Sequence, residues 1–121
     1  MLVRHHVALA AEHFEDLGWT VETHGQKGFN GVAILAHDAQ PVETGRGLAG
    51  DPTDEHSRYI EADVHGIRVA SIYLPNGNPQ PGPKFDYKLG WMKRLRQRAK
   101  ELLPLEIPIV LAGDYNVIPH D

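Results

Sequence analysis

Residues 113–116, with the sequence Gly-Asp-Tyr-Asn, place a carboxylate and a carboxamide two positions apart. They follow the apolar run 107–112, which predicts a buried strand, and open α/β folds bind ligands beyond the carboxyl ends of their strands. Asp114 would take a proton from water or hold a divalent cation, and Asn116 would bind the same cation or a phosphate oxygen. For this segment alone, the alternative is a loop in which Asp and Asn cap a turn.

A second candidate is the segment 71–77, where Tyr73 ends a predicted strand and Asn76 stands in the turn after it. A phenol and a carboxamide in such places can both donate hydrogen bonds to an anion. By itself the segment also fits a tyrosine packed at a strand end and an ordinary turn asparagine.

The glycine-rich segment 25–31 is a third candidate, because its glycines would let the backbone approach a ligand closely. Lys27 and Asn30 would contact phosphate, and Phe29 would supply an apolar wedge. The pattern Gly-x4-Gly-Lys-Ser/Thr is absent, so this is not a nucleoside triphosphate-binding loop.

Basic residues gather in 84–100, although the chain as a whole has a net charge of −4. One acid, Asp86, stands there among basic residues at 84, 88, 93, 94, 96, 98 and 100. The helical face with Lys93, Arg96 and Lys100 is of the kind that is usually solvated. Lys84 and Lys88 share another face, near the proline-rich segment, and are the better candidates for contacting phosphate.

Sites built from histidine or cysteine are not expected. The eight histidines have neither the His-x-His nor the His-x-x-x-His spacing, and cysteine is absent. The missing cysteines exclude a disulfide framework and fit a reducing compartment. Since there is no signal-peptide pattern and no apolar run of about 20 residues, we expect a cytoplasmic protein with no membrane contact.

These segments must be positioned by an α/β domain. Apolar spacing predicts a helix from Val3 to Leu17 that ends at Gly18, and a second helix over 85–103. Strands are predicted at 19–23, 32–36, 59–64, 67–74 and 107–112, with a tight hairpin at 65–66. Residues 38–57 are predicted to form one long loop, and the proline-rich segment 75–83 neither helix nor central strand.

Five blocks of the sequence, in this order, resemble the exodeoxyribonuclease III family of the endonuclease/exonuclease/phosphatase superfamily. They are THGQKGFNGVAIL (23–35), DEHSRYIEADV (54–64), RVASIYLPNGNP (68–79), KFDYKLGWMKRL (84–95) and VLAGDYNVIPHD (110–121). The resemblance implies an αββα sandwich of two sheets, a divalent cation (Mg²⁺ or Mn²⁺) and hydrolysis of DNA phosphodiesters in repair. The activities implied are 3′-to-5′ exonuclease on double-stranded DNA and endonuclease on abasic-site DNA, with no obligate protein partner.

The resemblance also implies roles for the matching residues. Tyr73 would be the active-site tyrosine. Asp114 would orient or deprotonate the attacking water and bind the metal, and Asn116 would bind the metal or a phosphate. The expected DNA-binding residues are Gly28, Phe29, Asn30 and Asn76, joined by Lys88 from the charge pattern.

Two parts of the family pattern have no match in this sequence. Family members begin with Trp-Asn-x-Asn and a Gln-Glu pair that supplies the principal metal ligand, and end with segments that supply a catalytic histidine. Glu22, Glu43 and His120 do not match these residues. We therefore expect residues 1–121 to form one truncated domain, a partial αββα sandwich of about one mixed sheet and two helices. It should be inactive alone, with Val69, Ile72 or Val110 on an uncovered face.

Three functions remain open. The first is the metal-dependent DNA nuclease, and the second is a non-catalytic truncated product that binds DNA weakly through Asn30, Asn76 and Lys88. The third is a phosphatase or phosphodiesterase acting on a small molecule or lipid. The blocks GFNGVAI and LPNGNP favour the nuclease over the third. An out-of-frame Gln-Glu or Asp-His block in the flanking gene sequence would favour the second.

Overall fold

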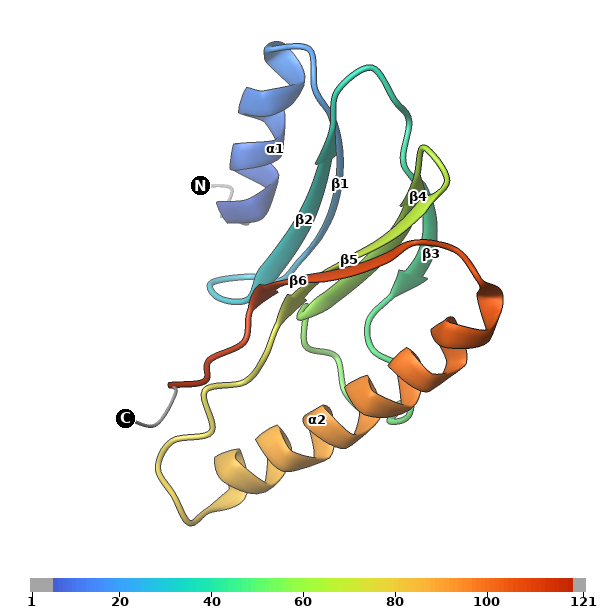
Figure 1. The fold of residues 1–121 in the computed structure, drawn as a ribbon. Coiled ribbons are helices and arrows are strands. Elements are labelled where there is room, and N and C mark those ends of the chain that lie inside the picture. The colour runs from blue at the N-terminus through green and yellow to red at the C-terminus, as the bar shows by residue number, and fades with distance from the viewer. Residues whose placement is uncertain (1–5, 119–121) are drawn as a thin grey trace.

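The computed structural model describes residues 6–118, in which two helices enclose two β-sheets (Figure 1). The helices are α1 (His6–Asp16) and α2 (Pro83–Leu102), and α2 continues into a 3₁₀ turn, η1 (Leu103–Leu105). The strands are β1 (Thr20–Gly25), β2 (Gly31–Ala36), β3 (Val42–Arg46), β4 (Tyr59–Val64), β5 (Ile67–Tyr73) and β6 (Ile109–Asp114). No helix within the described part of the chain is long and apolar enough to span a membrane.

The strands divide between two sheets, so the prediction of about one mixed sheet was wrong. β1 and β2 form an antiparallel pair, and β3-β4-β5-β6 form a four-stranded sheet in which only the β5–β6 pairing is parallel. Apolar spacing predicts strands but does not say which strands pair, and this caused the error. The layers α1, β1–β2, β3–β6 and α2 follow one another in Figure 1, which confirms the αββα order.

Each face of the four-stranded sheet has its own apolar core. On one face, Val32 and Ile34 of β2 pack against Ile60 and Ala62 of β4. On the other face, Trp91 of α2 is buried in a cluster with Leu48, Tyr59, Ala70, Ile72 and Leu74. The alternation along β4 and β5 therefore supplies apolar residues to both layers.

The expected uncovered face is covered in part by β2. Val69 packs against the β2–β4 cluster, and Ile72 belongs to the core under α2. Val110, on the edge strand β6, is 46% exposed. Of the three residues expected on that face, Val110 alone is among the exposed large apolar residues of the described part of the chain.

Several element bounds differ from the predictions. The predicted loop 38–57 contains β3, an edge strand whose register shifts between Glu43 and Gly45 and whose residues are largely exposed. Helix α2 begins at Pro83, which is tolerated because the first N–H groups of a helix have no intrahelical acceptor. The hairpin at His65-Gly66 is confirmed, with positive φ angles of 52° and 78°. Val3, the predicted start of the first helix, lies outside the described residues.

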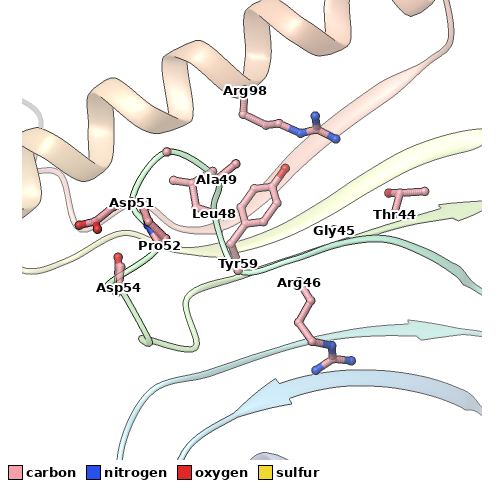
Figure 2. Close-up of a pocket in the computed structure, with 12 residues that line it drawn as sticks. Thr44, Gly45, Arg46, Leu48, Ala49, Asp51, Pro52, Asp54, Tyr59 and Arg98 are labelled. Carbon is pink, nitrogen blue, oxygen red and sulfur yellow. The ribbon is translucent and has the colours of Figure 1, made fainter.

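A buried carboxylate joins α2 to the four-stranded sheet. The Glu61 side chain has no exposed surface and accepts hydrogen bonds from Arg98 Nη2 (2.7 Å), Thr44 Oγ1 (2.9 Å) and the Tyr59 hydroxyl. Figure 2 shows Arg98 extending from α2 toward the side of the sheet that carries Tyr59 and Thr44. This network fixes the C-terminal part of α2 against β3 and β4.

Candidate active site

The parallel pairing of β5 and β6 brings two of the predicted catalytic residues together. Tyr73 and Asp114 are register partners at the ends of these strands. The pairing continues one step further, because Leu74 N donates to the Asp114 carbonyl oxygen at 2.9 Å. The segments that follow the two strands leave the same edge of the sheet side by side (Figure 1). This edge is where an open α/β fold binds its ligands.

Asp114 and Asn116 are held by a turn that they build themselves. Asp114 Oδ1 accepts the Asn116 backbone N–H at 2.8 Å, and Asn116 has a positive φ of 44°. Asn116 Nδ2 donates to the Leu74 carbonyl oxygen at 2.7 Å. The capped turn foreseen as an alternative is thus present, yet no hydrogen bond from the side chains of residues 10–118 or from the described backbone engages Asp114 Oδ2 or Asn116 Oδ1.

Lys88 reaches this turn from α2. Its Nζ donates to the backbone carbonyl oxygens of Asn116 (2.8 Å) and Asn76 (3.3 Å). Asn76, Lys88, Asp114 and Asn116 line one cleft, which we call the Asp114 cleft. The sequence placed Lys88 near the site but did not show that it contacts main-chain oxygens.

Arg58 is a residue of the candidate site that no sequence motif predicted. Its backbone carbonyl oxygen accepts the Tyr73 N–H at 2.8 Å, and its Nη1 donates to the Tyr73 carbonyl oxygen at 3.2 Å. The guanidinium carbon also lies 4.8 Å from the centroid of the Tyr73 ring, within cation–π range. Arg58 therefore holds both the backbone and the ring of Tyr73.

A second groove adjoins the Asp114 cleft and holds other predicted DNA-binding residues. Phe29, which is 65% exposed, lines it together with Arg58, Asn76 and Lys84. We call it the Phe29 groove. It combines an aromatic ring with two cations, a pairing suited to bases and phosphates.

Gly28 and Asn30 shape the loop that presents Phe29. Both have positive φ angles, 87° and 62°. The Asn30 side chain turns back and donates to Gln26 Oε1 at 3.2 Å, and the same oxygen accepts the Ser57 N–H at 2.8 Å. These contacts join the β1–β2 loop to the segment before β4, so DNA contact by Gly28 and Asn30 themselves stays a prediction.

The oxygen donors of the Asp114 cleft fit a hard divalent cation. One carboxylate and one amide oxygen remain for such an ion, and Mg²⁺ usually keeps several waters beside one or two protein carboxylates. Within residues 10–118, whose side chains the structure describes, no group of three or more His, Cys, Asp or Glu side chains could hold a metal ion. At this turn, Asp114 and Asn116 are the residues that would hold such an ion.

We expect Mg²⁺ to bind the 121-residue chain with a Kd in roughly the millimolar range or weaker, because two ligands with a single charge make a poor site. Calorimetry, together with Asn116 amide shifts in NMR spectra, would measure this affinity. Asp114→Asn should abolish the Asn116 response. Asp51→Asn, at an exposed carboxylate in the loop before β4, should leave it unchanged. Micromolar binding would contradict the two-ligand site.

Comparison with known proteins places the chain in a family. The model of the Endonuclease/Exonuclease/phosphatase family matches residues 3–121. The chain is 34% identical over 119 residues to exodeoxyribonuclease III from Haemophilus influenzae. This match covers 94% of the chain and 44% of the relative.

Solved structures agree with this placement. The 3′-5′ exonuclease NExo from Neisseria meningitidis has a TM-score of 0.84 at 36% identity, over 92% of this chain and 43% of that one. An AP endonuclease from Archaeoglobus fulgidus has a TM-score of 0.83 at 33% identity, over 98% of this chain and 45% of that one. The chain thus spans less than half the length of the relatives that it matches. It belongs to the Endonuclease/Exonuclease/phosphatase family.

Proposed function

We propose that this chain, as one truncated domain, supplies part of the active site of a metal-dependent DNA phosphodiester hydrolase of DNA repair. The observation that carries the proposal is the pairing of Tyr73 with Asp114 at the carboxyl edge of the sheet, with Asn116 in the turn beyond. Relatives named as a 3′-5′ exonuclease and an AP endonuclease support this reaction class, and another Neisseria NExo structure holds a product DNA hairpin. The cysteine-free sequence supports a cytoplasmic location.

The chemistry follows from the atoms that the turn leaves available. Asp114 Oδ2 would orient the attacking water and accept its proton, since Oδ1 is occupied by the Asn116 N–H. The Tyr73 hydroxyl would donate a hydrogen bond to a phosphate oxygen, where negative charge increases in the transition state. A divalent cation, Mg²⁺ or Mn²⁺, would supply Lewis-acid stabilisation of the same charge.

The Phe29 groove supports double-stranded DNA, including abasic-site DNA, as the substrate. Arg58 and Lys84 are suited to the phosphate backbone, which provides most of the affinity of nucleic-acid binding. Phe29 projects from its loop and would occupy the space that a missing base leaves in the stack. A small-molecule phosphodiesterase would not need such a groove beside the reacting centre.

A non-catalytic DNA-binding product is the second candidate. It is favoured by the finding that no group of three or more His, Cys, Asp or Glu side chains within residues 10–118 could hold a metal ion. Both candidates predict DNA binding and differ only in cleavage.

We expect no measurable Mg²⁺-dependent cleavage of an abasic-site duplex by the purified 121-residue chain. Removing one transition-state donor lowers the rate by about 10²–10³, and several of the groups that the family resemblance implies have no match in this sequence. A gel assay with a labelled duplex measures this. Robust cleavage that disappears in Asp114→Ala would show that the described residues suffice for catalysis.

A chimera tests the proposed function itself. In it, this chain replaces the matching 119-residue segment of the Haemophilus influenzae exodeoxyribonuclease III. We expect Mg²⁺-dependent cleavage that falls by about 10²–10³ in Asp114→Ala and persists in Asp51→Ala. A folded chimera that binds the duplex but cleaves it no faster than its Asp114→Ala variant would favour the non-catalytic candidate.

A further inference from the structure

Lys88 connects the two loops that carry the candidate catalytic residues. Its ammonium group donates to main-chain oxygens in both, at Asn76 after β5 and at Asn116 after β6. The hydrogen bonds continue from there, since the Asn116 N–H reaches Asp114 Oδ1 and Asn116 Nδ2 reaches the Leu74 carbonyl oxygen. The orientation of the Asp114 carboxylate therefore depends on a chain of contacts that begins at α2.

The backbone at Gly77 is shaped for the Lys88 side chain. Gly77 has a positive φ of 80°, and a Cβ there would lie 2.6 Å from Lys88 Cδ, 3.1 Å from its Cβ and 3.4 Å from its Cγ. Real Cβ atoms do not approach a neighbour to 2.6 Å, so the aliphatic stem of Lys88 crosses the loop where a side chain is missing. A lysine reaching outward to a phosphate would not require this close passage.

We propose that Lys88 is a positioning residue, which fixes the Asn116 turn and through it Asp114, rather than a ligand for DNA phosphate. This inference rests on the proposed function, because it assigns Asp114 the catalytic role. Two of the three ammonium N–H groups of Lys88 are used by backbone carbonyl oxygens. An ammonium group held by two backbone carbonyl oxygens is fixed in position, so it has little freedom to move into contact with a DNA phosphate.

Salt dependence of DNA binding separates a positioning lysine from a phosphate ligand. Each phosphate contact contributes about 0.9 to the slope of log K against log salt concentration. We expect Lys88→Met to leave this slope unchanged in fluorescence-anisotropy titrations of the 121-residue chain with an abasic-site duplex. Lys84→Met is the matched control on the same helix, and its slope should decrease by about 0.9 because Lys84 lines the Phe29 groove.

Hydrogen exchange measured by NMR reports on the turn without DNA or metal. We expect exchange of the Asn116 amide to become roughly 3- to 10-fold faster in Lys88→Met. The exchange rate of Ile72 in the core should not change. Lys88→Arg, which keeps a charged donor, should restore part of the protection. A merely structural role would change the core amides as much as Asn116.

Gly77→Ala tests the close passage independently. It should displace Lys88 and give the same faster exchange at Asn116. In a Lys88→Ala background, which removes Cγ and Cδ, the additional effect of Gly77→Ala on Asn116 should be smaller, so that the two substitutions are not additive.

The proposal is overturned if Lys88→Met decreases the salt slope by about 0.9, or if it leaves Asn116 exchange unchanged. Absence of DNA binding by the unmodified chain would contradict the proposed function instead. The exchange measurement would then still decide whether Lys88 holds the turn.

Discussion

Gly113→Ala is expected to destabilise the chain severely. Gly113 has a φ of 143°, and a Cβ at this position would lie 2.0 Å from the Ile72 carbonyl oxygen and 2.9 Å from the Ile72 backbone carbon and nitrogen. Ile72 is its register partner in the parallel β5–β6 pair and is buried in the core. Backbone atoms within two paired strands cannot move aside as a flexible side chain can. We therefore expect a loss of roughly 4 kcal/mol or more, among the largest that single substitutions cause.

Gly90→Ala is the matched control for this experiment. Gly90 lies inside α2, and a Cβ there would meet no atom within 4 Å. Alanine in a helix interior is favoured over glycine by roughly 0.5–1 kcal/mol, so this variant should be as stable as the unmodified chain or more so. Urea unfolding followed by circular dichroism would compare the midpoints. A Gly113→Ala protein with the same midpoint as Gly90→Ala would show that β6 does not pair with β5 as described.

Glu61→Ala should lower the free energy of unfolding by about 3–5 kcal/mol, because it leaves the Arg98 guanidinium near the core without its carboxylate. The same substitution deprives Tyr59 and Thr44 of their acceptor. Glu101→Ala is the control, since Glu101 pairs with Arg98 at the helix surface, where ion pairs contribute about 0–1 kcal/mol. Equal destabilisation by the two variants would contradict this assignment.

The same network predicts how stability depends on pH. Burial acts to raise the pKa of Glu61, but hydrogen bonds from Arg98, Tyr59 and Thr44 outweigh it, so its pKa lies below the ordinary value of 4.5. A carboxylate with a depressed pKa stabilises the fold above pH 4.5, and this contribution is lost as the pH falls through the folded-state pKa. Acid unfolding curves of the Glu61→Gln variant should therefore be flatter than those of the unmodified chain. If the acid unfolding curves of the two proteins are equally steep, a group other than Glu61 causes the loss of stability at low pH.

The hairpin shows how far the sequence could predict the site. A two-residue turn at 65–66 pairs Val64 with Ile67, and the same register continues to Tyr59 and Ile72. One further step sets Arg58 opposite Tyr73, where the structure finds it. Counting back from the turn could therefore have identified Arg58 as the neighbour of Tyr73.

Other features could not be obtained in this way. β3 was missed because it is an exposed edge strand with a glycine and an irregular register, so it carries no apolar alternation. The packing of the two sheets brings Val32 and Ile60, which are far apart in the sequence, into one apolar cluster. The contacts of Lys88 depend on the angle at which α2 crosses the sheet, and charge spacing carries no information about that angle.

The parallel register of β5 and β6 has a consequence for changes in chain length. Leu111 packs against the core under α2, while its neighbour Val110 is exposed, so β6 alternates with a period of two residues. A single-residue insertion or deletion inside β6 would exchange these positions and shift Asp114 out of register with Tyr73. Length differences among related chains are therefore expected in the 103–108 connection that precedes β6, where an added residue alters neither the alternation nor the register.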